Sequence, residues 1–365
     1  MTMEMKELST GQSGRVRDKR IARIVELISP SQILEEVPLS SEEEDAVLAH
    51  RESVARVLDR EDDRLLVVVG PCSVHDVDAA LDYAQRLGAR AEELCDDLLI
   101  AMRVYFEKPR TTVGWKGLIN DPHLDGSGDV NNGLLLARGL LREVLDVGLP
   151  IGCEFLDPIT PQYISDLVAW GAIGARTTES QIHRQLASGL SMPVGFKNAT
   201  DGTVKIAVDA VRAAAAQHAF AGVDVSGTPA ILHTQGNDDC HVILRGGRGA
   251  PNYDAEGVES ALRELRAASL PERVIVDASH ENSGKDHQVQ PTVLADIAGQ
   301  VAGGNRAIVG VMLESFIVGG RQEFEPGAEM VYGQSITDPC MDWETTVLAL
   351  DRLAAASRAR RGADR

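Results

Sequence analysis

Positively charged side chains recur in this sequence just after short apolar segments. They are Arg103, Lys108, Arg110, Arg176, Lys197 and Arg245. The chain as a whole is acidic, with a formal net charge of -19. If the fold gathers these cations, their mutual repulsion requires bound anions to offset it. Arginine offers a planar fork to phosphate or carboxylate, and lysine a compact charge, so the pattern predicts a site for polyanionic substrates.

A second set of residues could hold a metal ion. Cys72, His280, Glu314 and Asp338 supply one thiol, one imidazole and two carboxylates, but they lie far apart in the sequence. A thiolate favours zinc or iron, whereas carboxylates accept manganese or magnesium. Such a cation could polarise an aldehyde oxygen or lower the pKa of a bound water. Taken singly, Cys72 is more often a small buried residue and His280 a helix cap, so only the fold can make this set a site.

The elements that must position these residues alternate between strand and helix. Eight apolar segments with strand character lie at 64–71, 98–106, 149–155, 172–176, 193–197, 241–245, 273–277 and 307–313. Helical periodicity follows at 77–95, 133–147, 203–216, 255–268 and 289–301. An open doubly wound sheet uses the same alternation, but no GxGxxG follows the first strand. The pattern therefore predicts an α/β protein with a (β/α)8 TIM barrel, whose catalytic groups lie at the carboxyl ends of the strands.

Two segments do not follow this alternation. We expect an N-terminal arm over 1–62, where Ser29 and Ser40 are suited to cap helices. The barrel would span 63–358, with an inserted β-hairpin at about 219–236. A short charged tail at 359–365 is expected to fray.

Composition narrows the class of protein. The chain has 365 residues and its apolar runs, such as 308–313, are far shorter than the roughly 20 residues of a membrane span. The first 23 residues lack the apolar region of a secretory signal, so a cytoplasmic location is expected. Five cysteines without CxxC spacing are expected to be reduced. The acidic charge argues against nucleic acid as a partner.

Long motifs carry a family resemblance. They are GPCSVHD at 70–76, MRVYFEKPRTTVGWKG at 102–117, GARTTES at 174–180, GFKN at 195–198, ILRGG at 243–247, SH at 279–280 and SITD at 335–338. With them the chain resembles the type I 3-deoxy-D-arabino-heptulosonate 7-phosphate (DAHP) synthases from about residue 33 to about residue 353. The resemblance implies a metal-dependent condensation of phosphoenolpyruvate with erythrose 4-phosphate, at the start of the shikimate route to aromatic amino acids.

The resemblance also assigns roles to residues. The implied ligands of one divalent metal ion (Mn2+, Fe2+, Zn2+ or Co2+) are Cys72, His280, Glu314 and Asp338. The implied substrate-binding residues are Arg103, Lys108, Pro109, Arg110, Thr111, Glu154, Arg176, Lys197 and Arg245, of which 108–111 would hold erythrose 4-phosphate. The implied catalytic residues are Lys108, His280, Cys72 and Asp338.

Three alternatives remain beside this interpretation. Lys197 could form a Schiff base, as lysines do in other barrel aldolases, although neighbouring anions would hold it protonated. The chain could be a catalytically silent regulatory partner. It could also be a related synthase that uses arabinose 5-phosphate or another aldose phosphate, although the motif at 108–111 favours the four-carbon sugar.

The family resemblance further implies a homodimer or homotetramer under feedback control by an aromatic amino acid. The implied inhibitor pocket contains Asp157, Pro158, Pro161, Gln162 and Ser191. Pro158 and the segment 191–193 resemble the tyrosine-sensitive branch of the family. Three departures from the family pattern are Ala199, an extra residue within 248–250, and Glu281 in place of a small residue.

Overall fold

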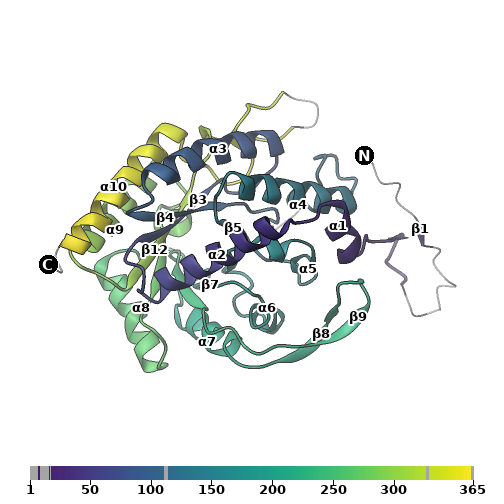
Figure 1. Ribbon diagram of the computed structural model, residues 1–365, viewed down its shortest axis with the longest axis horizontal. Coiled ribbons are helices and arrows are strands. Elements are labelled where there is room, and N and C mark those ends of the chain that lie inside the picture. Colours follow the sequence, from purple (N-terminus) through teal and green to yellow (C-terminus); the bar gives the residue numbers. More distant parts are fainter. Residues whose placement is uncertain (1–6, 9–15, 17, 111–113, 326–328, 363–365) are drawn as a thin grey trace.

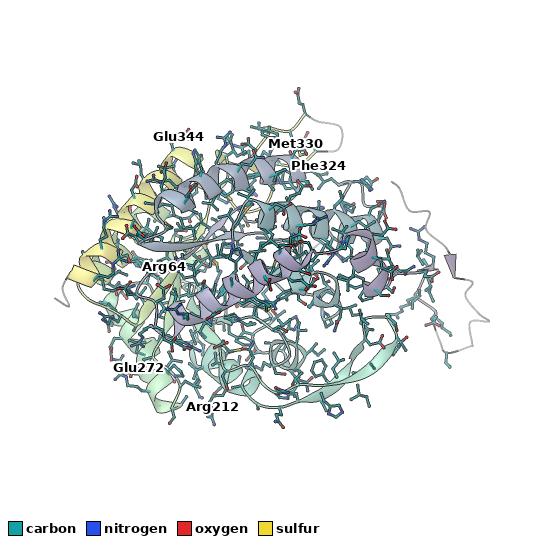
Figure 2. All side chains as sticks on the ribbon, in the orientation of Figure 1. Arg64, Arg212, Glu272, Phe324, Met330 and Glu344 are labelled. Carbon is teal, nitrogen blue, oxygen red and sulfur yellow. The ribbon has the colours of Figure 1, made fainter. Side chains whose placement is uncertain are left out.

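The computed structural model describes residues 7–8, 16, 18–110, 114–325 and 329–362. Figure 1 shows one body in which helices surround a central set of strands. Side chains fill the space between those strands and the outer helices (Figure 2). Within the described residues, no helix is both long enough and apolar enough to span a membrane.

The predicted barrel is confirmed. Its strands are β3 (Leu65–Gly70), β4 (Leu98–Arg103), β5 (Ile151–Glu154), β6 (Trp170–Ile173), β7 (Val194–Lys197), β10 (His241–Leu244), β11 (Val274–Asp277) and β12 (Ile308–Glu314). All neighbours pair in parallel, and β12 closes the barrel by pairing with β3 from Gly310↔Leu66 to Glu314↔Gly70. Every strand residue is buried, which explains why the strands read as continuous apolar runs rather than as alternating patterns.

Helices cover the outside of the barrel. They are α3 (Val77–Glu93), α4 (Val130–Asp146), α5 (Pro161–Ile164), α6 (Gln181–Ala187), α7 (Lys205–Ala214), α8 (Ala255–Ala267), α9 (Gln290–Ala302) and α10 (Trp343–Gly362), with two 3-10 turns, η1 (Ser165–Leu167) and η2 (His280–Asn282). Asp76, Asp129 and Asp254 cap α3, α4 and α8 by accepting a hydrogen bond from the first-turn backbone. Two differences from expectation stand out: β6 lies at 170–173 instead of 172–176, and α6 and α10 were not anticipated.

The N-terminal arm contains the two helices that its serines predicted, α1 (Pro30–Glu36) and α2 (Ser41–Leu58). Ser29 and Ser40 each form a capping box with the side chain three residues on. The last turns of α2 place Val54, Val57 and Leu58 in one apolar cluster with inward-facing strand residues such as Leu66. The arm therefore closes the amino-terminal end of the barrel, which we call the floor. A short pair, β1 (Glu7–Leu8) and β2 (Ile24–Val25), precedes it.

The inserted hairpin is also confirmed. β8 (Ala219–Val223) and β9 (Pro229–His233) pair antiparallel, and the turn between them has Gly227 at a φ of +79°, a conformation that favours glycine. The backbone N–H of Ser31 in α1 donates to the carbonyl of Val225 at 2.7 Å. The hairpin and the arm thus meet, although nearly 200 residues separate them in the sequence. A smaller pair, β13 (Val318–Arg321) and β14 (Gln334–Ser335), lies near the carboxyl ends of the barrel strands.

The carboxyl-terminal helix continues further than expected. α10 runs to Gly362, well into the segment 359–365 that was expected to fray. Arg360 is buried and donates to the carbonyl oxygens of Ile308 and Asp63, both at 3.0 Å. These contacts fix the last described turn of the chain against the floor of the barrel.

Candidate active site

A cavity of about 610 Å³ opens at the carboxyl ends of the barrel strands, the end that we call the mouth. The predicted substrate-binding residues that line it are Arg103, Lys108, Pro109, Arg110, Glu154, Arg176, Lys197 and Arg245. Thr111 lies outside the described residues. The structure therefore gathers on one surface six cations that lie at the ends of four separate apolar segments of the sequence.

Buried cations form the deepest wall of the cavity. The Arg103 guanidinium lies 3.5 Å from the centre of the Tyr105 ring and donates to Glu314 Oε1 at 3.0 Å. Lys197 Nζ donates to Glu154 Oε2, also at 3.0 Å. Burial raises the pKa of Glu154, but the Lys197 and Arg103 cations outweigh it and bring the pKa below its ordinary value. These two cations are thus matched by two carboxylates, and the excess of positive charge comes from the other lysines and arginines that line the cavity, such as Arg176 and Arg245.

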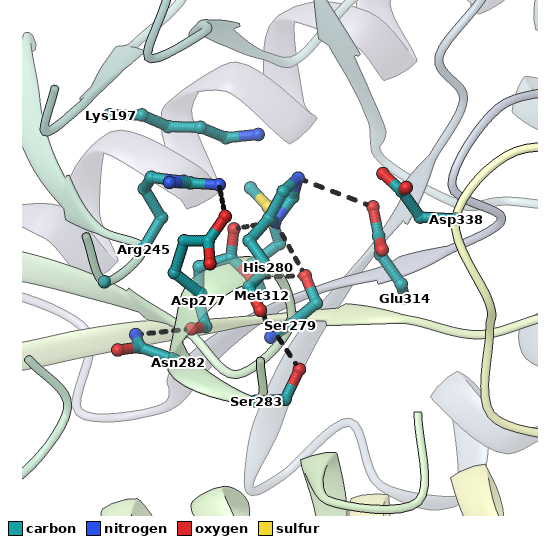
Figure 3. Close-up of polar contacts among 12 residues, drawn as sticks. Lys197, Arg245, Asp277, Ser279, His280, Asn282, Ser283, Met312, Glu314 and Asp338 are labelled. Carbon is teal, nitrogen blue, oxygen red and sulfur yellow. Dashed lines mark hydrogen bonds and ion pairs between the residues drawn. The ribbon is translucent and has the colours of Figure 1, made fainter. Parts of the chain in front are cut away.

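Three of the predicted metal ligands meet beside this wall. A thiol of Cys72 and carboxylate oxygens of Glu314 and Asp338 lie within 4.8 Å of one another. The fourth, His280, has its Nε2 3.7 Å from Glu314 Oε1. Figure 3 shows Glu314 and Asp338 on one side of the imidazole and Lys197 and Arg245 on the other. One sulfur, one nitrogen and carboxylate oxygens suit a divalent transition metal, so the residues present fit such an ion.

Lys108 connects the cationic wall to this cluster. Its Nζ lies 2.6 Å from Cys72 Sγ and 3.3 Å from Asp338 Oδ2. Burial and the Glu314 carboxylate raise the pKa of the Cys72 thiol to about 11. Burial also raises the pKa of Asp338, but Lys108 and His280 outweigh it, so that the pKa is lower than usual. The cluster thus carries proton acceptors and a proton donor in direct contact.

The orientation of His280 is set by a buried carboxylate. Asp277, the last residue of β11, has Oδ2 2.7 Å from His280 Nδ1 and accepts a hydrogen bond from the backbone of Ser279. Burial raises the pKa of Asp277, but the His280 imidazole lowers it below its ordinary value. With Nδ1 between Asp277 Oδ2 and Ser279 Oγ, which lies 2.9 Å away, Nε2 points towards Glu314. Carboxylate contacts of this kind fix the tautomer and the ring direction of a metal-binding histidine.

Comparison with known proteins decides the family. Residues 37–351 match the DAHP synthetase I family. The chain belongs to the DAHP synthetase I family. A phenylalanine-sensitive phospho-2-dehydro-3-deoxyheptonate aldolase of Escherichia coli K12 is 56% identical over 345 residues, covering 94% of this chain and 98% of the relative. A tyrosine-sensitive one of the same organism is 54% identical over 321 residues, covering 88% and 90%.

A solved structure agrees with these relatives. The phospho-2-dehydro-3-deoxyheptonate aldolase of Francisella tularensis superposes with a TM-score of 0.91 at 49% identity, over 94% of this chain and 100% of the other. Membership confirms the enzyme class that the motifs predicted, a DAHP synthase, which performs the first step of the shikimate pathway. It also confirms the barrel.

The three positions that the sequence suggested as departures, Ala199, the segment 248–250 and Glu281, all lie in loops near the mouth. Arg248 and Glu281 line the cavity itself. The segment around Arg248 makes a tight turn in which Gly247 N donates to Ala250 O at 3.0 Å. Ala199 is half-buried and closes the loop after β7 through a hydrogen bond from its N–H to Thr203 O at 3.2 Å. None of the three displaces a predicted substrate or metal residue.

The five residues of the implied inhibitor pocket line two different cavities. Pro161, Gln162 and Ser191 line a groove of about 620 Å³ whose other wall includes the hairpin residues Phe220 and Leu232. Asp157 and Pro158 line a separate cavity of about 860 Å³. Lys108, Pro109 and Arg110 line that second cavity as well as the active-site cavity, so the two cavities are neighbours.

Several residues at the mouth were not named as site residues from the sequence. Tyr105 and Glu107 both line the cavity and lie within the motif at 102–117, so the motif itself was the available signal. Glu107 accepts hydrogen bonds from the backbone N–H groups of Leu156 and Asp157. It therefore ties the loop after β4, which carries Lys108, to the loop that carries Asp157. Asp277 gave no signal, because one carboxylate ending an apolar run is common in any protein.

Proposed function

We propose that this chain condenses phosphoenolpyruvate with D-erythrose 4-phosphate to give DAHP and inorganic phosphate, with one divalent metal ion, Mn2+, Fe2+, Zn2+ or Co2+. The observation that carries the proposal is a cationic cavity placed directly beside the thiol and carboxylate cluster. Phosphoenolpyruvate brings a carboxylate and a phosphate, and the sugar brings a second phosphate. Three anionic groups account for the number of cations on the wall.

The roles of the cations follow from where they lie. Arg103, Lys197 and Arg245 are buried at the base of the cavity and are suited to hold phosphoenolpyruvate in a dry environment. Arg176 donates to the carbonyl of Pro109 at 3.3 Å and so connects the base to the segment 108–110. That segment, with Thr111 beyond the described residues, is the proposed contact for the sugar phosphate.

Cys72, His280, Glu314 and Asp338 would hold the metal. When bound, it supplies Lewis-acid polarisation of the aldehyde oxygen. Lys108 holds a proton between Cys72 Sγ and Asp338 Oδ2, next to the place where the aldehyde oxygen gains negative charge. This position suits Lys108 to donate that proton.

The reaction then balances without a covalent enzyme intermediate. Carbon 3 of phosphoenolpyruvate attacks the aldehyde carbon, and water adds at carbon 2. The resulting hemiketal phosphate loses inorganic phosphate by cleavage of its C–O bond. The cations that bound the phosphate ester then hold the departing phosphate.

The rival Schiff-base reaction requires a neutral Lys197 with an open path to a carbonyl. The structure favours another role, because Lys197 Nζ donates to the Glu154 carboxylate, and the side chain is buried. Borohydride reduction in the presence of both substrates distinguishes the two. We expect no covalent adduct, and an adduct on Lys197 identified by peptide mass spectrometry would exclude the metal-assisted reaction.

Feedback control is proposed to act through the groove between Pro161, Gln162, Ser191 and the hairpin. Its size suits an aromatic amino acid, and relatives at similar identity are named phenylalanine-sensitive and tyrosine-sensitive. Titration of activity with tyrosine, phenylalanine and tryptophan would identify the effector. We further propose a homodimer or homotetramer in which the arm and the hairpin take part, to be measured by light scattering after size exclusion.

The test of the proposed reaction uses chelator-treated enzyme and both substrates. Loss of phosphoenolpyruvate and release of phosphate are followed with and without added Mn2+. We expect turnover only with metal, and a lower rate with arabinose 5-phosphate. Absence of turnover with every divalent metal would favour the silent-partner alternative.

A further inference from the structure

The carboxylate of Glu281 lies among the cations that line the cavity. Glu281 Oε1 is 3.7 Å from a terminal nitrogen of Arg245 and 4.0 Å from Lys285 Nζ. Its side chain lines the cavity and is 29% exposed, so it faces the space that a bound anion would fill. An acidic group in this position opposes the binding of phosphate or carboxylate.

The backbone that carries Glu281 is fixed on both sides. Asn282 donates from its amide to the carbonyls of Leu244 and Asp277, at 3.1 and 2.8 Å. A Cβ atom at Gly246 would lie 2.8 Å from the carbonyl carbon of Glu281, so the loop after β10 packs directly on this turn. These contacts hold the backbone of the turn in place, whereas the side chain of Glu281 is held by ion pairs of 3.7 Å and 4.0 Å.

Arg245 is left with capacity for a ligand. It is buried, and within the described part of the chain its Nε has no hydrogen-bond partner. A contact of 3.7 Å to Glu281 is too long for a strong hydrogen bond. The pair is therefore loose enough for a phosphate or carboxylate oxygen to replace the glutamate.

We propose that Glu281 is an internal competitor for the anion site of Arg245. In the empty cavity it partly neutralises Arg245 and Lys285, and it turns outward when a substrate anion binds. The proposal rests on the proposed function, because it takes this cavity as the phosphoenolpyruvate site. Its consequence is a weaker hold on phosphate groups, including the phosphate released in each turnover.

The test compares anion binding before and after the charge is removed. Calorimetric titration of the Mn2+-loaded enzyme with inorganic phosphate, and separately with phosphoenolpyruvate, gives the two dissociation constants. We expect Glu281→Gln and Glu281→Ala to bind both anions roughly 10-fold more tightly than the unchanged enzyme. Glu264→Gln removes the same charge from an exposed position on α8 and should leave both constants unchanged.

The outcomes of this titration separate a failure of the Glu281 proposal from a failure of the proposed function. Equal or weaker anion binding by both Glu281 variants, with melting temperatures like that of the unchanged enzyme, overturns the internal competitor. Tighter binding by Glu264→Gln as well would show a general charge effect and would also overturn it. If the unchanged enzyme binds phosphate but not phosphoenolpyruvate, the proposed function fails, while the phosphate constants still decide the role of Glu281.

Discussion

The two ends of the barrel both contain buried arginines, but the arginines have different partners. At the floor, Arg360 donates to the backbone carbonyls of Ile308 and Asp63, and Arg273 donates to that of Asp238 and pairs with Asp59. At the mouth, Arg245 faces a cavity and has one loose ion pair, with Glu281, among the described residues.

This difference shows what separates a structural arginine from a ligand-binding one. A guanidinium whose donors meet fixed backbone oxygens holds segments of the chain together, and it has little left to offer a ligand. A guanidinium that meets only a movable carboxylate can exchange that partner for a substrate. Arg103 stands between the two, because it contacts backbone oxygens and Glu314 while its charge still faces the cavity.

The largest effect is expected at the mouth. Cys72→Ala removes the sulfur from the ligand cluster and should lower kcat by roughly three orders of magnitude, about 4 kcal/mol in the barrier, because Lewis-acid assistance is lost. Steady-state assays with Mn2+ measure this, with metal content checked by mass spectrometry. If Cys72→Ala keeps more than a tenth of the activity, the cluster is not the metal site.

The mouth also contains a carboxyl group, Glu107, whose contribution to stability depends on pH. Burial raises the pKa of Glu107 from its ordinary value of 4.5 to about 8. Between these values the unfolded chain releases a proton that the folded chain keeps, so the Glu107 contribution to stability is lost as the pH rises through this window. Relative to Glu107→Gln, the native protein should lose about 4 kcal/mol of unfolding free energy between pH 5 and 9. Urea unfolding at several pH values measures this difference, and a constant difference would contradict a raised pKa.

At the floor, the expected effect is on stability alone. Arg360→Ala removes several charge-assisted hydrogen bonds to backbone carbonyls and leaves those oxygens buried. The free energy of unfolding should fall by about 2 kcal/mol, with kcat/KM unchanged below the melting temperature. Arg263→Ala, at an exposed position on α8, is the control and should change neither quantity. A loss of activity without a loss of stability in Arg360→Ala would contradict the purely structural role of this arginine.

The smallest effect is expected from a residue that acts through another. Asp277→Asn weakens the hold on His280 Nδ1, and the affinity for Mn2+ should fall roughly 10-fold, about 1.4 kcal/mol. Calorimetry measures this without any assay of turnover. Asp286→Asn makes the same charge change on the same loop, at a carboxylate that is about half exposed, and should leave the affinity unchanged. Equal losses of Mn2+ affinity in both variants would show that the effect comes from the net charge alone.

The strands and the helices of the arm could be predicted from the sequence, because local patterns of residues encode them. The end of the strand that carries Lys197 was placed correctly, and those that carry Arg103 and Glu154 were placed within three residues, because fully buried parallel strands are continuous apolar runs bounded by polar residues. The arm helices followed from the capping serines. The predicted strand 172–176 began two residues after the true start of β6. The apolar run continues through small residues beyond Trp170 and Gly171, and these residues do not mark the limits of the strand.

Other features depend on packing that no local pattern shows. α10 buries small and polar residues such as Thr346 and Ser357 as well as leucines, so its sequence lacks a clean apolar face. Glu107 and Asp277 are buried carboxylates whose partners come from neighbouring loops. The separation of Asp157 from Gln162 into two cavities likewise depends on how the loop after β5 turns.

The most direct test of the account is anomalous diffraction at the manganese edge from crystals soaked with Mn2+ and phosphoenolpyruvate. The account predicts one strong peak among Cys72, His280, Glu314 and Asp338, with the phosphate and carboxylate of the ligand against the cations of the same cavity. It also predicts no bound anion on the floor arginines. A manganese peak elsewhere, or phosphoenolpyruvate at the floor, would contradict the division between the two ends of the barrel.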